Sequence, residues 1–220
     1  MIIIEHYIRS QRMENIAMAE KQKMDAMWDD SPIDVSTEVN FIWSIANKLR
    51  GTYQSDKYKD VIIPMVIIRR FECALASTKQ KVVDQFKVNP LYPAKAMYRV
   101  SGYQFYNTSE FNLAELVNDA DHLAANFKSY IQGFSVNIQS LDFDKQIDKM
   151  DKNNRLLSVV KAFSELDLNP VTIDNVKMGY IFEDLIRRFS ENAEAGDHYT
   201  GRDIIKLMVN ILLAEGCDDI

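Results

Sequence analysis

Residues 57–76, KYKDVIIPMVIIRRFECALA, decide the fold, because they contain the run Val61 to Ile68, which is apolar on every side. Such a run predicts a buried element, although periodicity alone does not separate a helix from a strand. The apolar pattern continues through Phe71 and Leu75, and Pro64 stands near what would be the first turn of a helix. The stretch therefore predicts a buried helix.

Apolar residues recur at helical spacing on both sides of this stretch. The segments that show the spacing are 36–51, 112–132, 151–168 and 175–193. Gly51 is a natural C-terminal stop for the first of them. Residues 79–110 are the least regular part of the chain, and 88–95 and 101–111 are expected to be loops that carry aromatic side chains.

Sparse glycine and proline support the same fold class. Only seven Gly and five Pro occur in 220 residues, which favours helices over a turn-rich sandwich or barrel. The Met-rich stretch 11–28 predicts an N-terminal arm helix that ends at 29–32. We therefore predict an all-α helical bundle with three parts: an arm at 1–32, a helical domain at 33–170, and further helices at 171–220.

Composition bounds the class of protein. With 47% hydrophobic and 10% aromatic residues, the chain can bury a core. Two cysteines without a CxxC pattern suit a reducing compartment, and three histidines far apart in sequence offer no metal-ligand spacing. No run approaches the roughly 18 apolar residues of a membrane span. These features predict a cytoplasmic protein with no membrane partner and no metal site.

Positive charge is concentrated in residues 48–99. This segment has eleven Lys/Arg against four Asp/Glu, a net +7, within a chain of net −6. The candidate contacts to DNA phosphate or to a protein partner are Lys48, Arg50, Lys57, Lys59, Arg69 and Arg70. A solvated charged face is the alternative for the segment, and a structural ion pair is the alternative for Arg69 and Arg70.

A second short motif, GDHYTGRD at residues 196–203, precedes an amphipathic run. Thr200 and Asp203 match a capping box, which predicts a helix over 201–215. Its apolar stripe contains Ile204, Leu207, Met208, Ile211 and Leu212. The backbone N–H groups at a helix start suit a carboxylate or phosphate, but such a motif is most often an ordinary helix start, and Asp203 would oppose an anion.

Four blocks carry a resemblance to a known family. They are residues 40–75, FSELDLNP at 163–170, MGYIFEDLIRRFSE at 178–191 and AGDHYTGRDIIKLMVNILL at 195–213. In this order they resemble the modification (methyltransferase) subunit of type I restriction–modification systems. The resemblance spans about residues 33 to 213, nearly everything after the arm.

The resemblance implies an adenine-N6 DNA methyltransferase that uses S-adenosylmethionine. Its implied partners are a specificity subunit, a restriction subunit and double-stranded DNA, with the N-terminal helical region packing against the specificity subunit and helping to hold DNA. The block around His198, Tyr199 and Thr200 resembles the one that lines the methionine end of the cofactor. Gly201 stands where the family usually has proline, so the cap is expected to be looser here.

Catalytic motifs are missing from the sequence. The seven glycines include no GxG pair, which the cofactor loop of such a methyltransferase needs. Asn89-Pro90-Leu91-Tyr92 lacks the second proline of the family's catalytic Asn-Pro-Pro-aromatic motif and precedes the cofactor block, so we interpret it as a turn. We therefore predict no catalytic residue in this chain, an inactive chain by itself, and cofactor binding by the full-length protein only.

We consider two interpretations, of which the sequence favours the first. In the first, the chain is a fragment that leads into an absent α/β methyltransferase domain, so the apolar face of the 201–215 helix should be under-covered and could drive self-association. In the second, the chain is a self-contained, non-enzymatic helical interaction module, and the same helix should be buried in its own bundle.

Overall fold

In the computed structural model the described residues are 33–138, 143–191 and 202–212, and every regular element among them is a helix. Two isolated bridges, Arg50 with Tyr53 and Asn107 with Phe134, are the only extended pairings in these residues. The predicted all-α fold is confirmed. None of the described helices combines the length and the apolar character that crossing a membrane requires.

The central element is α3, Lys59–Leu75, which confirms the helix predicted from the apolar run. Its buried positions include Val61, Ile62, Met65, Val66 and Ile68, so the first half of the helix is in contact with protein on nearly every side. Pro64 lies inside the helix, beyond the first turn, where it removes one backbone hydrogen bond.

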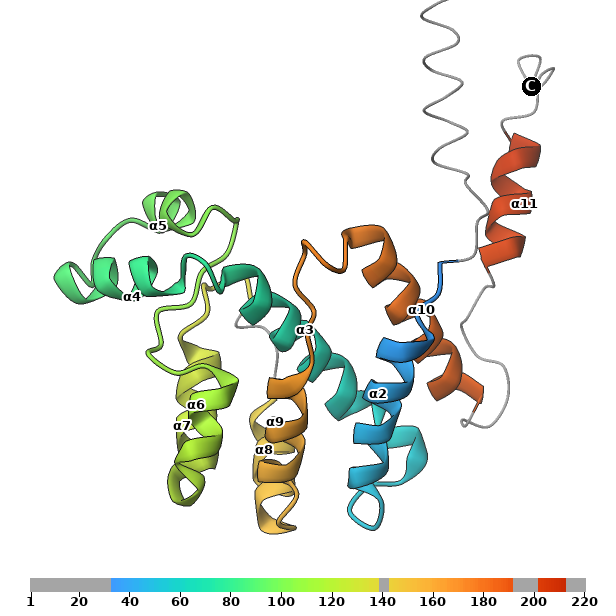
Figure 1. Cartoon of the computed structure of the whole chain (residues 1–220), viewed down its shortest axis with the longest axis horizontal. Helices are drawn as coiled ribbons and strands as arrows, with labels where there is room; N and C mark the ends of the chain where they lie inside the picture. Colours follow the sequence, from blue (N-terminus) through green and yellow to red (C-terminus); the bar gives the residue numbers. More distant parts are fainter. Residues whose placement is uncertain (1–32, 139–142, 192–201, 213–220) are drawn as a thin grey trace, which may run out of the picture. The chain divides into compact units, whose positions relative to one another are not determined.

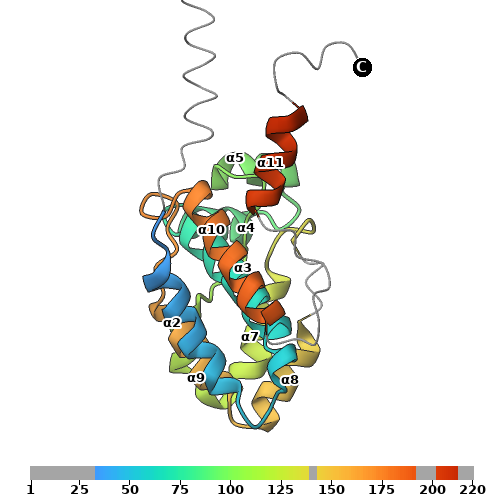
Figure 2. The same cartoon turned by 90° about the vertical axis from the view of Figure 1, so that its right-hand side faces the viewer.

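Helices α2 (Ser36–Ala46), α9 (Leu156–Glu165) and α10 (Asn175–Glu191) pack around α3, as Figures 1 and 2 show. The rings of Trp43 on α2 and Phe189 on α10 lie 5.3 Å apart and close the contact between these two helices. Gly51 has a left-handed backbone conformation, with φ at +81°. It ends the helical segment that begins with α2, and this stop was predicted.

A second group of helices packs against α9. It comprises α6 (Leu113–Asn118), α7 (Leu123–Gln132) and α8 (Asp144–Lys152). The fully buried rings of Phe127, Tyr130 and Phe143 lie between them, with ring centroids 6.2 Å apart in the Phe127–Tyr130 and Phe127–Phe143 pairs. These helices and α3 therefore share one hydrophobic core.

Helices α4 (Lys79–Val88) and α5 (Ala94–Ser101) pack on each other beyond the C-terminal end of α3 (Figure 1). Residues 79–110, expected to be the least regular part of the chain, contain these two helices, which were not predicted from the sequence. Each buries only two residues, so neither contains a long apolar run like the one that marks α3. The loops expected at 88–95 and 101–111 are confirmed over 89–93 and 102–111.

Two further expectations are corrected. The run 112–132 is not one helix, because it breaks between α6 and α7, where the Asp119 carboxylate accepts hydrogen bonds from His122 and Asn126. The run 151–168 holds the end of α8, a turn with Asn154 at φ +55°, and then α9. Helix α8 was not predicted, because Ile147 and Met150 are its only buried residues.

Candidate functional site

Three of the predicted cations, Lys48, Arg50 and Lys57, lie on the short segment that joins α2 to α3, and Lys59 follows as the first residue of α3. This segment contains the 3-10 turns η1 (Asn47–Leu49) and η2 (Ser55–Lys57). The four exposed side chains, called here the basic loop, are Lys48, Arg50, Lys57 and Lys59. Their one described ion pair joins Lys57 to Asp56 at 3.8 Å, with both side chains about half exposed, and such pairs contribute little. Most of this charge is therefore available to a ligand.

Tyr53 fixes the basic loop to α8. Tyr53 as a whole is 7% exposed, and its hydroxyl donates a hydrogen bond to the Gln146 carbonyl at 3.3 Å. Burial, and then the Asp60 carboxylate, raise the pKa of Tyr53 to about 12, so the hydroxyl stays protonated. The Lys149 ammonium lies 3.9 Å from the centre of the Tyr53 ring. Lys149 therefore joins the basic loop, a neighbour that nothing in the sequence indicated.

Arg70 serves the fold. It is 9% exposed, and its guanidinium donates to the Leu168 carbonyl at 2.8 Å, the Ile173 carbonyl at 2.6 Å and the Asn175 side-chain oxygen at 3.0 Å. Burial lowers the pKa of Arg70 from its ordinary value. These bonds hold the connection between α9 and α10 against α3, and a phosphate could reach the guanidinium only if they were broken.

Arg69 points into the structure as well. Its Nε donates to the Leu166 carbonyl at 2.6 Å, and its terminal nitrogen pairs with the Glu72 carboxylate. The structural ion pair given as the alternative for Arg69 is therefore present. The structure thus separates Arg69 and Arg70 from the exposed cations of the basic loop.

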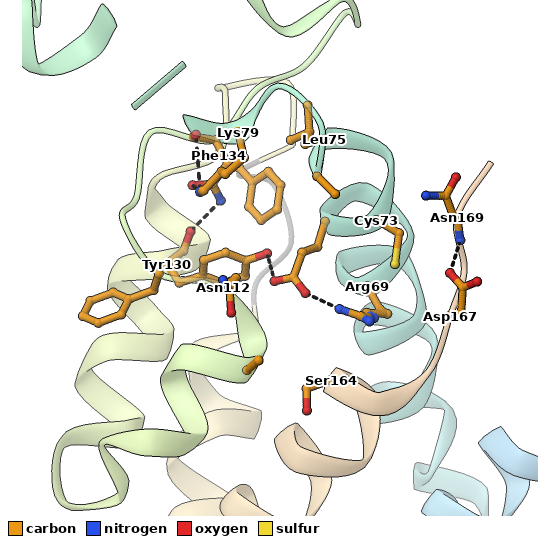
Figure 3. A pocket seen from close by; sticks show the side chains of 15 residues that line it. Arg69, Cys73, Leu75, Lys79, Asn112, Tyr130, Phe134, Ser164, Asp167 and Asn169 are labelled. Atoms are coloured by element: carbon orange, nitrogen blue, oxygen red, sulfur yellow. Dashed lines mark hydrogen bonds and ion pairs between the residues drawn. The ribbon is translucent and has the colours of Figure 1, made fainter. Parts of the chain in front are cut away.

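Glu72 is the centre of a polar network beside α3, and Figure 3 shows two of its partners, Arg69 and Tyr130. Besides the Arg69 pair, its carboxylate accepts the backbone N–H of Leu113 at 2.7 Å and the Tyr130 hydroxyl at 2.9 Å. Burial, and next the Glu72 charge, raise the pKa of Tyr130 well above its ordinary value, which keeps the hydroxyl a donor. Glu72 therefore joins α3 to the start of α6 and the end of α7.

Lys79 extends the network at the start of α4. Its ammonium donates to the Asn107 side-chain oxygen at 2.9 Å and lies 5.6 Å from the centre of the Tyr130 ring. Burial lowers the pKa of Lys79 to about 8. Asn107 in turn donates to the Tyr130 carbonyl at 3.0 Å and accepts the Ser109 N–H at 2.8 Å. Asn107 therefore holds the Lys79 ammonium in place.

A cavity of about 440 Å³ opens between these groups. Figure 3 shows Arg69 and Cys73 of α3 on one side and Tyr130 of α7 on the other. Burial raises the pKa of the Cys73 thiol, so this cysteine is not an activated nucleophile. Sequence reasoning missed the cavity because its walls come from segments up to about a hundred residues apart.

Of the predicted cofactor contacts and the helix predicted after them, the structure describes only the helix. His198, Tyr199 and Thr200 lie outside the described residues. The helix predicted at 201–215 is present as α11, Arg202–Leu212. Its apolar side chains are exposed, with Ile204 at 55% and Leu207 at 59%.

The described residues thus define an all-helical domain with an exposed basic loop, and no group of His, Cys, Asp or Glu side chains among them is placed to hold a metal ion. A sequence model of the HsdM N-terminal domain matches residues 39–163, from α2 to α9. Because the match covers more than half of the chain, the protein belongs to this family, the N-terminal domain of the M subunits of type I restriction–modification systems. No curated protein matches the chain.

The family fixes the coarse function. The chain is the N-terminal part of a type I restriction–modification methyltransferase subunit. Membership of the family implies S-adenosylmethionine as the cofactor of the full-length protein and suggests a complex with a specificity subunit and DNA.

Proposed function

We propose that this domain contributes to binding double-stranded DNA in the assembled complex, and that it does so through the basic loop together with Lys149. The observation that carries the proposal is the exposure of Lys48, Arg50, Lys57 and Lys59 on one short segment with a single weak carboxylate partner. Neutralising phosphates with such side chains releases counterions from DNA, which favours binding.

The basic segment 48–99 divides into two surfaces. Helix α3 is 17 residues long, so its ends, which lead to the basic loop and to α4, are separated by roughly 25 Å. The exposed cations beyond that second end are Lys81, Lys87, Lys95 and Arg99. Lys87 pairs with Glu110 as Lys57 pairs with Asp56, so each surface has four exposed cations and one described ion pair, and the basic loop differs by its neighbour Lys149. We assign DNA contact to the basic loop and keep the second surface as the comparison.

Charge reversal in the assembled complex tests this assignment. Changing Lys48, Arg50, Lys57 and Lys59 to Glu should weaken DNA binding and flatten the plot of log affinity against log salt by roughly 0.9 for each phosphate that the variant no longer neutralises. The matched variant reverses Lys81, Lys87, Lys95 and Arg99 instead. An unchanged salt slope in the first variant, or an equal effect in the second, would count against the assignment.

We further propose that the parent protein is an adenine-N6 DNA methyltransferase of the cytoplasm, acting with both a specificity subunit and a restriction subunit. His198, Tyr199 and Thr200 are proposed to contact S-adenosylmethionine in a form of the protein that includes the catalytic domain. Equilibrium dialysis of that longer form should show cofactor binding that Tyr199→Ala weakens. Undiminished binding would remove Tyr199 from the proposed site.

The exposed face of α11 supports a second proposal, self-association of the isolated chain. Sedimentation of the chain with Leu207→Glu and Ile211→Glu should show less dimer than the unchanged chain. Monomers in both samples would contradict self-association and would favour packing of this face against the rest of the methyltransferase.

A further inference from the structure

Among the residues that the structure describes, one cation of the cavity beside α3 has no anionic partner at hydrogen-bond distance. The two carboxylates of the cavity are already engaged, because Glu72 accepts from three donors and Asp167 accepts from the Asn169 N–H at 2.9 Å and the Thr172 hydroxyl at 3.1 Å. Arg69 is paired with Glu72. Lys79 differs, since both of its hydrogen-bond acceptors are neutral oxygens of Asn107.

Lys79 is half-buried, and its charge is destabilised in this state. A cation removed from water is destabilised unless an anion compensates it, which agrees with the low pKa of about 8 at this amine. The more distant carboxylates of Glu72 and Glu115 only partly offset the burial. A negative group entering the cavity would supply the missing partner, and Asn107 already holds the ammonium in position to receive it.

The aromatic side chains that line the cavity can pack against a planar apolar group of a ligand. Phe111, Tyr130 and Phe134 line the cavity, and its volume of about 440 Å³ lies within the range of about 300–1,000 Å³ typical of small-molecule sites. We propose that this cavity binds a small organic anion, with a carboxylate or phosphate against the Lys79 ammonium and a planar apolar group against the aromatic walls. This inference does not depend on the DNA contact proposed above.

Titration calorimetry of the whole chain with benzoate tests the proposal. Benzoate has both the charge and the ring, benzamide keeps the ring without the charge, and inorganic phosphate has the charge without the ring. Benzoate should bind in the millimolar range, and benzamide should bind about tenfold more weakly, because it lacks a charge-assisted hydrogen bond. Phosphate that competes with benzoate identifies a phosphate-accepting site, whereas phosphate that does not compete restricts the site to carboxylates.

Variants locate the site. Lys79→Gln keeps a hydrogen-bond donor but removes the charge, and it should lower benzoate affinity about tenfold. Lys81→Gln, an exposed neighbour on α4, should leave that affinity unchanged. Equal affinity for benzoate and benzamide, or undiminished benzoate binding by folded Lys79→Gln, would overturn the proposal.

The pH dependence of the unchanged chain decides the matter if Lys79→Gln does not fold. Benzoate remains an anion above neutrality, so its binding follows the protonation of Lys79. Affinity should therefore fall as pH rises through about 8, whereas benzamide binding should not change. Benzoate affinity that stays constant across this range would exclude Lys79 as the partner of the anion.

Discussion

Replacing Arg70 with methionine should destabilise the fold, whereas it should leave the DNA contact of the folded molecules intact. Methionine fills much of the space of the arginine stem but donates no hydrogen bond. The substitution therefore leaves the buried carbonyls of Leu168 and Ile173 without the donors that lie 2.8 and 2.6 Å away in the structure. Asn175 at the start of α10 loses a partner as well.

The expected loss is about 3 kcal/mol in the free energy of unfolding. Each buried acceptor left without a partner costs about 1–3 kcal/mol. The variant no longer buries a charged guanidinium, and the desolvation cost that it avoids offsets part of this loss. For a chain of this size a loss of about 3 kcal/mol lowers the melting temperature by about 6–12 °C. The stability of Arg70→Lys should lie between that of the unchanged chain and that of Arg70→Met, because a single ammonium cannot reach all three acceptors.

Urea denaturation followed by circular dichroism measures this loss. Arg99→Met is the matched control, because Arg99 is exposed on α5, and its effect should stay within about 0.5 kcal/mol. A loss below about 1 kcal/mol for Arg70→Met would refute the structural role of the guanidinium. An unchanged stability together with weaker DNA binding would return Arg70 to the set of phosphate contacts.

Three further outcomes are expected. Asn112→Ala removes the capping box of α6 and should cost about 1 kcal/mol in urea denaturation, and no loss would mean that the box is not needed. Gly133→Ala places a Cβ 2.8 Å from the loop before α6 and should cost about 1–3 kcal/mol, whereas Gly179→Ala, with open space around it, should cost nothing. The folded pKa of Lys79, about 8, lies below the ordinary 10.5, so the unfolded chain binds more protons between these values and stability should rise with pH there. Thermal unfolding across that range should lose this rise in Lys79→Met and keep it in Lys81→Met.

The sequence predicts the elements that bury a long apolar face. Helix α3 was predictable because its apolar run continues at helical spacing, and α10 because Met178, Ile181, Leu185 and Phe189 recur on one side. Helix α8 was not, since its nine residues are mostly Asp and Lys and only two of them are buried. The position of α8 depends on its packing against the rest of the core, and helix propensity, which is a local property, does not describe this packing.

The candidate sites were predictable only where exposure follows from local charge. The cations of the basic loop were identified from composition. The two arginines of α3 have the same charge as the cations of the basic loop. What sets them apart is their hydrogen bonds to carbonyls about a hundred residues further along the chain. The polar network around Glu72 likewise joins it to Leu113 and Tyr130, 41 and 58 residues away. No local pattern marks such pairs.

The contact between Glu72 and the start of α6 makes folding of this region cooperative. Helix α6 has six residues, far fewer than the roughly 12–15 that an isolated helix needs in water. Its capping box is local, but the Leu113 N–H is bound by a carboxylate of α3, and the helix packs on α9. We therefore expect α6 to be stable only together with α3 and α9. Its amide hydrogens report on opening of the whole core rather than on fraying of one short turn.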